Sequence, residues 1–128
     1  MLIIDHASTP VEWRGPQNNR NIEHRTLLSA ANGAQQMALW EVYPPPGAGA
    51  PPHVHPHEET ITVLRGQIEA YIDGETFKAQ AGQTLFIPAG AGHSFAVTGD
   101  EKAHLLIAFA AAAPTWERID WKAWLADR

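Results

Sequence analysis

Glycine-containing turns divide the part of the chain after residue 53 into short segments of similar length. These turns are Arg65-Gly66, Asp73-Gly74, Ala81-Gly82, Ala89-Gly90-Ala91-Gly92 and Thr98-Gly99-Asp100. The segments between them are rich in β-branched and aromatic residues, and turns spaced by about 8–12 residues are typical of a β-sandwich or a small barrel. Between residues 36 and 110 no segment accommodates a helix of three turns. The pattern therefore predicts an all-β fold.

The length of the chain, 128 residues, is that of one domain with one core. We expect an N-terminal arm with the first strand or strands at 1–35, the barrel at 36–113, and a C-terminal tail at 114–128. In the tail, Trp121, Trp124 and Leu125 have the i, i+3, i+4 spacing of one face of a short helix. This face is expected to pack on the barrel exterior or on a partner subunit.

Five prolines and two glycines lie between Pro44 and Pro52. Proline fixes φ and has no amide hydrogen, so neither a helix nor a central strand is expected there. The segment is predicted to be a stiff extended loop that leads to His53.

Composition and charge narrow the function classes. The chain has no cysteine, so disulfides, Cys-rich zinc sites and thiol nucleophiles are excluded. The absence of disulfides is compatible with a protein of a reducing compartment. The chain has nine Lys and Arg and fourteen Asp and Glu, which gives a net negative charge, and its basic residues do not cluster. Both features argue against a nucleic-acid partner. The longest apolar run, Leu105 to Ala113, has nine residues, whereas a membrane span needs about 20. The first residues lack a basic region, so we expect no signal peptide and a cytoplasmic protein.

Three of the seven histidines lie within five residues, in His53-Val54-His55-Pro56-His57-Glu58-Glu59. In an extended chain, side chains alternate between two faces, which places residues 53, 55, 57 and 59 on one face. Burying three imidazoles and a carboxylate without an ion would leave polar groups unsatisfied, and these donors suit a divalent transition metal. Pro56 is expected to distort the strand, which leaves the direction of His57 open.

A fourth ligand comes from elsewhere in the chain. His93 opens a predicted strand directly after a glycine-rich loop, where its side chain can point into a barrel. An ion held by His53, His55, Glu59 and His93 would carry a net charge of about +1 and, in an octahedral site, would keep two positions for water, dioxygen or substrate. Fe, Mn, Ni, Co, Cu and Zn all remain candidates, because these ligands discriminate poorly among them.

These residues lie in two motifs that resemble those of the cupin superfamily. The first cupin motif is Gly, five residues, His-x-His, three or four residues, Glu, six residues, Gly; here Gly47, His53, His55, Glu59 and Gly66 have that spacing. The second motif is Gly, five residues, Pro-x-Gly, two residues, His, three residues, Asn; here it is Gly82, Pro88, Gly90 and His93, with Val97 in place of Asn. The motif Asn is not a metal ligand, so this departure is expected to make the barrel interior more apolar without removing the ion.

The resemblance implies a jelly-roll barrel, or double-stranded β-helix, with a divalent metal ion as its cofactor. Cupins include dioxygenases, isomerases, decarboxylases, lyases and barrels that only bind a small molecule. We expect a metal-dependent enzyme acting on a small oxygen-bearing organic substrate, with dioxygenase chemistry as the first hypothesis. The alternatives are an isomerase or lyase that uses the ion as a Lewis acid, and a non-catalytic sugar- or metabolite-binding barrel.

Other residues receive less specific roles. Proton transfer is assigned to His57 or Glu59, with a loop position at the pocket mouth as the alternative for His57. Tyr43 is the candidate pocket hydroxyl. The remaining histidines, which lack partners at ligand spacing, are expected to be surface or hydrogen-bonded core residues: His6, His24 and His104. Leu27, Leu28 and the tryptophan-bearing tail are expected to cover exposed strand edges of a second copy, which predicts a homodimer.

Overall fold

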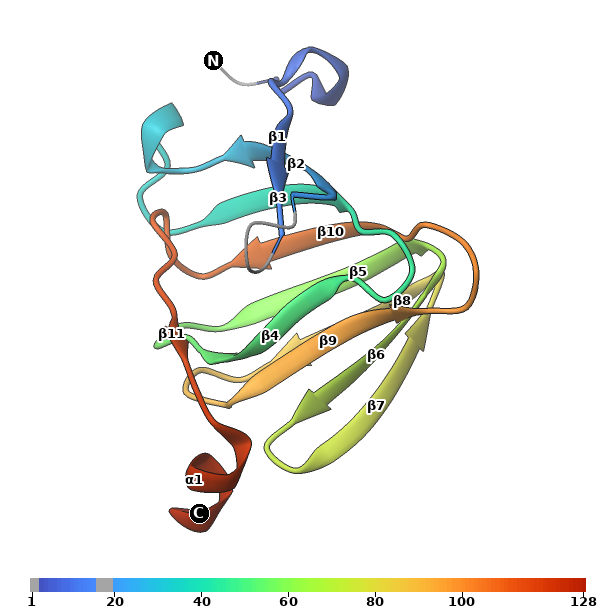
Figure 1. The fold of residues 1–128 in the computed structure, drawn as a ribbon. Coiled ribbons are helices and arrows are strands. Elements are labelled where there is room, and N and C mark those ends of the chain that lie inside the picture. Colours follow the sequence, from blue (N-terminus) through green and yellow to red (C-terminus); the bar gives the residue numbers. More distant parts are fainter. Residues whose placement is uncertain (1–2, 16–19) are drawn as a thin grey trace.

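The computed structural model describes residues 3–15 and 20–128, so residues 1–2 and 16–19 of the expected arm lie outside the described residues. It contains two antiparallel sheets that face each other as a jelly roll (Figure 1). One sheet has the strand order β1-β2-β3-β10-β5-β8 and the other β11-β4-β9-β6-β7. The strands are β1 (Glu12–Arg14), β2 (Ile22–Leu28), β3 (Ala38–Tyr43), β4 (Gly49–Val54), β5 (Glu59–Arg65), β6 (Gln67–Ile72), β7 (Glu75–Gln80), β8 (Gln83–Ile87), β9 (His93–Thr98), β10 (His104–Phe109) and β11 (Glu117–Arg118), followed by helix α1 (Trp121–Ala126). The all-β prediction is confirmed.

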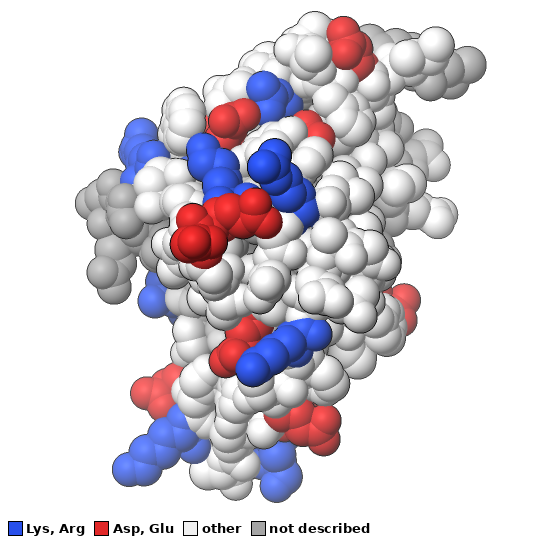
Figure 2. Space-filling model, turned by 90° about the vertical axis from the view of Figure 1, so that its right-hand side faces the viewer, with Lys and Arg blue, Asp and Glu red and all other residues white. Residues whose placement is uncertain are grey.

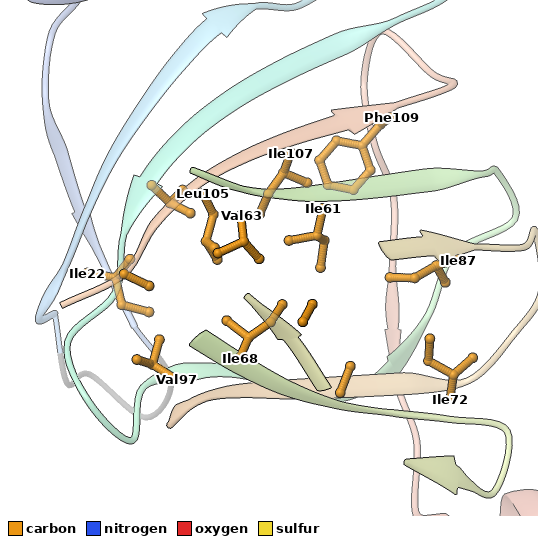
Figure 3. Packing of buried hydrophobic residues seen from close by; sticks show 14 of the residues in the cluster. Ile22, Ile61, Val63, Ile68, Ile72, Ile87, Val97, Leu105, Ile107 and Phe109 are labelled. Carbon is orange, nitrogen blue, oxygen red and sulfur yellow. The ribbon is translucent and has the colours of Figure 1, made fainter. Parts of the chain in front are cut away.

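The core lies between the two sheets (Figure 3). Alternation along the strands produces it: in β10, Leu105, Ile107 and Phe109 are buried while the residues between them are partly exposed. In the opposite sheet, Ile68 and Ile72 of β6 point toward them. Each such side chain contributes about 1.5–3 kcal/mol when it is removed from water. This apolar packing fixes the two sheets against each other.

The hairpin between β6 and β7 turns at the predicted Asp73-Gly74 pair. Both residues have positive φ, +44° at Asp73 and +94° at Gly74, as the tight turn that matches strand twist requires. A side-chain oxygen of Asp73 also accepts hydrogen bonds from the Gly92 amide, at 3.0 Å, and from the Trp124 indole, at 2.9 Å. The turn therefore joins the start of β9 to the C-terminal helix.

The predicted loop at Pro44–Pro52 is wrong in its second half, because β4 (Gly49–Val54) is an inner strand of its sheet, between β11 and β9. The pairing of β4 with β9 is irregular between Ala50 and His53, where Pro51 and Pro52 lie. Prolines cannot donate to a sheet, and this interruption of the pairing is where they are tolerated. The interruption ends at His53, which pairs with His93.

The C-terminal tail forms the expected short helix and packs on the barrel exterior. Trp121 lies edge-on to Tyr71 of β6, with ring centroids 4.8 Å apart, and Asp120 caps the helix by accepting from the amides of Lys122 and Ala123. Figure 1 shows the helix beyond β11, at the end of the molecule opposite the short 3₁₀ helix His6–Ser8. In the part of the chain that the structure describes, no helix has the length and apolar character needed to cross a bilayer.

Candidate metal centre

Four buried side chains converge at one end of the interior. His53 belongs to the end of β4, His55 follows that strand, Glu59 opens β5 and His93 opens β9. One donor atom from each lies within 4.8 Å of the donor atoms of the other three. The two sheets each contribute to the group, because β5 belongs to one and β4 and β9 to the other. The four ligands expected from the sequence are therefore brought together.

The donor atoms are in close contact. The Nε2 atoms of His53 and His55 are 3.1 Å apart, and the Nε2 atoms of His55 and His93 are each 3.1 Å from Oε1 of Glu59. The rings of His53 and His93 have centroids 4.1 Å apart. All four side chains direct a polar atom toward one small volume.

Each histidine is fixed by a backbone carbonyl behind it. Nδ1 of His53 lies 2.6 Å from the carbonyl of Pro51, that of His55 lies 2.7 Å from the carbonyl of Thr115, and that of His93 lies 2.9 Å from the carbonyl of Ala91. Since a carbonyl oxygen only accepts, all three Nδ1 atoms carry the hydrogen and donate it. The Nε2 atoms then face the centre, where each can carry a proton or bind a metal ion. Such outer hydrogen bonds set the orientation and basicity of metal-binding histidines.

The electrostatics of the group favour a cation. Burial, with a smaller contribution from the nearby His93, lowers the pKa of His53 to about 4, so His53 is neutral at pH 7. Burial would raise the pKa of Glu59, but its hydrogen bonds with His55 and His93 bring that pKa below its usual value. Burial likewise opposes the charged form of His55, while its contacts with Glu59 and Thr115 raise its pKa. An ionised carboxylate thus lies against the Nε2 atoms of His55 and His93, and because a carboxylate oxygen only accepts, either a proton or a metal ion has to lie between it and each nitrogen.

The donor set fits a divalent transition ion. Two imidazole lone pairs separated by 3.1 Å repel each other unless a proton or a cation lies between them. Three neutral imidazoles and one carboxylate are ligands that such ions accept, and the carboxylate partly neutralises the charge. The four residues can therefore hold a metal ion, and their chemistry does not distinguish one first-row ion from another.

A largely apolar cavity of about 260 Å³ is lined in part by three of the four residues, His53, His55 and Glu59. Its wall on the first sheet includes Trp40 and Phe109, whose ring centroids are 4.5 Å apart, and Phe95 lies on the other sheet. Trp116 lines the cavity, is largely exposed, and has its ring centroid 6.3 Å from that of His53. A small organic molecule in this cavity would have an aromatic wall on one side and the donor group at one end.

The model of the Cupin domain matches residues 40–109, more than half of the chain. This chain belongs to the cupin family. The cupin is 35% identical over 105 residues to polyketide synthase CurC of Streptomyces cyaneus, an alignment that covers 77% of this chain and 66%, slightly less than two thirds, of CurC. It is 27% identical to polyketide cyclase RemF of Streptomyces resistomycificus, with a TM-score of 0.76 and coverage of 94% and 86% of the two chains. An RmlC-like cupin from Shewanella frigidimarina shares the fold at 18% identity, with a TM-score of 0.73 and coverage of 88% and 92%.

His57, which lies between His55 and Glu59 in the first motif, is not one of the four residues of the metal group. His57 stacks on His55, with ring centroids 4.9 Å apart, and its Nε2 accepts a hydrogen bond of 3.3 Å from the amide of Thr115. It is not among the residues that line the cavity. The alternation that would align it with the ligands ends at Val54, because residues 55–58 form the connection to β5. Burial, followed by the proximity of His55, lowers the pKa of His57.

The contacts of Tyr43 and His104 on the outer face of the first sheet, together with that of His6, test two of the remaining expectations from the sequence. Tyr43 stacks on His104, with ring centroids 4.3 Å apart, and does not line the cavity. His104 donates to Glu41 at 2.8 Å, and His6 lies 3.3 Å from the same carboxylate oxygen. His6 is exposed and His104 is partly buried and hydrogen-bonded, as expected. Tyr43 is therefore not the pocket hydroxyl in this structure.

His24 is buried and hydrogen-bonded as expected, but it also lines the cavity, as do Arg14 and Arg118. The sequence offers no signal for this, since His24 lies in a segment without a motif and its neighbours in space come from β1 and β3. Figure 2 shows one face of the surface, where the described basic and acidic side chains are interspersed without a broad patch of one sign.

Proposed function

We propose that this cupin is a metal-dependent enzyme that acts on a flat, oxygen-bearing organic substrate of the polyketide class. The observation that carries the proposal is the pairing of an anchored three-histidine, one-carboxylate group with an aromatic cavity of about 260 Å³. The names of two relatives, a polyketide synthase and a polyketide cyclase, support the substrate class. Carbonyl and phenolic oxygens suit the metal end, and a planar carbon skeleton suits the wall of Trp40 and Phe109.

The proposed reaction is an intramolecular ring closure. A carbon next to one carbonyl loses a proton and bonds to the carbon of a second carbonyl, whose oxygen takes up a proton; loss of water can follow. The reaction needs no oxidant. When bound, a divalent ion supplies Lewis-acid polarisation of a carbonyl oxygen.

The chain's own residues would orient the substrate and move the proton. Trp40, Phe95 and Phe109 exclude water and hold the carbon skeleton flat. We retain Glu59 as a proton-transfer candidate, since it lines the cavity. For His57 we propose a role through His55, against which its ring stacks with centroids 4.9 Å apart.

Dioxygenase chemistry is the second candidate. The donor set favours it as much as ring closure, because three imidazoles and one carboxylate also suit redox-active ions. A binding barrel without turnover is the third.

One experiment separates the three. The protein, loaded in turn with Zn, Mn or Fe, is incubated with an aryl-substituted triketone under isotopically labelled dioxygen, and the products are analysed by mass spectrometry. Ring closure gives an isomer or the loss of one water, whereas a dioxygenase incorporates the label. Binding without either product supports the third candidate, and the protein stripped of metal by a chelator is the control.

We also propose a homodimer, on the sequence argument that strand edges need a cover. Leu27 is fully buried within its own chain, so the contact would have to use other residues, such as the exposed Leu64 and Phe86 of β5 and β8. Light scattering coupled to size exclusion tests this, and a species of 14.0 kDa contradicts it. The cytoplasm stays a prediction from the sequence.

A further inference from the structure

The interior wall of β2 carries a histidine that the metal centre does not use. His24 is only 2% exposed and lines the cavity. Its Nε2 lies 3.0 Å from the hydroxyl oxygen of Thr26, and its ring is edge-on to Trp40, with centroids 4.7 Å apart. The contact with Thr26 uses one of the two ring nitrogens of His24. A buried imidazole in an apolar cavity, whose other nitrogen is not engaged by this contact, is suited to a ligand.

His24 lies across the aromatic wall from the metal group. The ring of Trp40 is edge-on to the rings of both His24 and Phe109, and Phe109 in turn lies 5.3 Å, between ring centroids, from His55. In the sheet, β2 is separated from β5, which carries Glu59, by β3 and β10. The cavity therefore has two polar ends, and a wall of aromatic rings connects them.

The charges around His24 indicate what this second end can bind. Burial, with a smaller effect of Arg14, lowers the pKa of His24 to about 4, so the ring is neutral at pH 7. Arg14, which also lines the cavity, is paired with Glu12 at 2.9 Å, and Glu12 is the strand partner of His24. The positive charge of Arg14 is thus paired with a carboxylate. A neutral oxygen fits it better than a carboxylate or a phosphate does.

Thr26 lets the neutral ring serve either kind of oxygen. A hydroxyl can donate to Nε2 or accept from it. If Thr26 donates, Nδ1 carries the hydrogen and binds a carbonyl; if Thr26 accepts, Nδ1 is an acceptor and binds a hydroxyl or an enol. Neither case requires a charged imidazole in the cavity.

We propose that His24 is a ligand-binding residue that hydrogen-bonds a carbonyl or hydroxyl oxygen of an elongated aromatic ligand whose other end reaches the metal group. The inference rests on the proposed function and names the two-ended substrate that its site would take. It assigns specificity to β2, a segment that precedes the matched family region at residues 40–109.

Two chelating probes test the proposal. Naphthalene-2,3-diol can occupy the metal end and the aromatic wall, and 6-acetylnaphthalene-2,3-diol adds a carbonyl at the far end. Their dissociation constants are measured by calorimetry on the zinc-loaded protein. We expect the ketone to bind about 3- to 10-fold more tightly, which is the effect of one added hydrogen bond. Equal affinities for the two probes would overturn the proposal.

Variants assign the preference to the ring. In His24→Leu the ketone should lose its advantage, while the affinity of the plain diol stays within about 2-fold of that of the parent protein. In His24→Gln, which keeps a side-chain donor, part of the preference should return. A ketone preference that survives in His24→Leu contradicts the proposal. Trp40→Phe is the matched control, and it should weaken both probes by the same factor.

A measurement on the parent protein covers the case in which the variants do not fold. With nitrogen-15-labelled histidine, the Nδ1 resonance of His24 should shift with the ketone and stay in place with the diol; an unchanged resonance with both probes counts against the proposal. If neither probe binds the zinc-loaded protein, the proposed function itself fails, and that result is distinct from equal binding of the two.

Discussion

His53 and His93 are direct strand partners, and each donates from Nδ1 to the carbonyl of the residue two positions before it. Their rings lie 4.1 Å apart between centroids, across the pairing of β4 with β9. Two of the four donors are thus positioned by the sheet itself rather than by a mobile loop. Sites built on regular elements hold their geometry more closely than sites on loops.

A divalent ion should stabilise the fold, because the four donors converge only in the folded chain. With the ion at about 100 times its dissociation constant, we expect about 2.7 kcal/mol of stabilisation and a rise in Tm of about 10 °C. Differential scanning calorimetry with and without zinc measures this. In Glu59→Gln the rise should fall to a few degrees, since the only carboxylate of the group is lost.

The neighbouring residue provides the control for that variant. Glu58 is exposed, so Glu58→Gln should keep the full stabilisation by zinc. An unchanged response in Glu59→Gln would show that zinc binds elsewhere.

The close approach of β4 to β9 depends on Gly49. A Cβ on this residue would clash with the carbonyl oxygen of Phe95, so Gly49→Ala must push the strands apart at the end of β4 opposite His53. We expect a loss of about 2–3 kcal/mol in the free energy of unfolding, measured by urea denaturation. Gly47→Ala is the control: it has φ of +82° but no atom within 4 Å of the new methyl, so a loss of about 1 kcal/mol is expected. Equal losses in both variants would refute the crowding argument.

The metal ligands could be predicted from the sequence because they have characteristic spacings within two short segments, 47–66 and 82–97. The same alternation argument did not place His57, since the strand ends at Val54 and the connection to β5 begins there. Prolines predicted a loop at 44–52, but Pro51 and Pro52 occupy an interruption in an otherwise paired strand. A prediction from the sequence considers each proline by itself, whereas a sheet accommodates prolines wherever its hydrogen bonds between strands are interrupted.

Buried polar groups outside the motifs could not be predicted because their partners are distant in the sequence. Glu41 accepts from His104, 63 residues away, and the cavity position of His24 depends on Trp40 of the next strand. Neither pair has a characteristic spacing. Only the pairing of β2, β3 and β10 brings them together.

His24 should make the metal-free protein sensitive to acid. Its pKa is lowered from 6.5 to about 4, so the unfolded chain takes up a proton that the folded protein resists. The stabilising contribution is complete above pH 6.5 and is lost as the pH falls toward 4, with a slope of about 1.4 kcal/mol per pH unit. Urea denaturation at several pH values should show a shallower slope in His24→Leu over this window. A slope identical to that of the parent protein would show that His24 does not titrate there.

Glu41 should anchor the N-terminal segment to the outer face of the first sheet. It is 5% exposed; burial would raise its pKa, but His104 and His6 together lower it. Glu41→Gln should cost about 1.5–3 kcal/mol near pH 6, the value for hydrogen bonds to a charged group. Because His6 is half exposed, His6→Asn should cost no more than about 1 kcal/mol. Urea denaturation of both variants tests the ranking, and similar losses would contradict it.

Restoring the motif residue at position 97 should destabilise this cupin. Val97 is 3% exposed and belongs to the apolar cluster between the sheets, where it pairs with Ile68 across β9 and β6 (Figure 3). In Val97→Asn the amide would be buried among aliphatic side chains, and an unsatisfied buried amide costs about 1–3 kcal/mol. Zinc affinity should stay unchanged, because His93 is four residues away at the other end of β9. Val97→Ala, which loses volume without adding a polar group, separates the two effects: if urea denaturation finds Val97→Asn at least as stable as the parent protein, the amide has a partner and the apolar interpretation of this position is wrong.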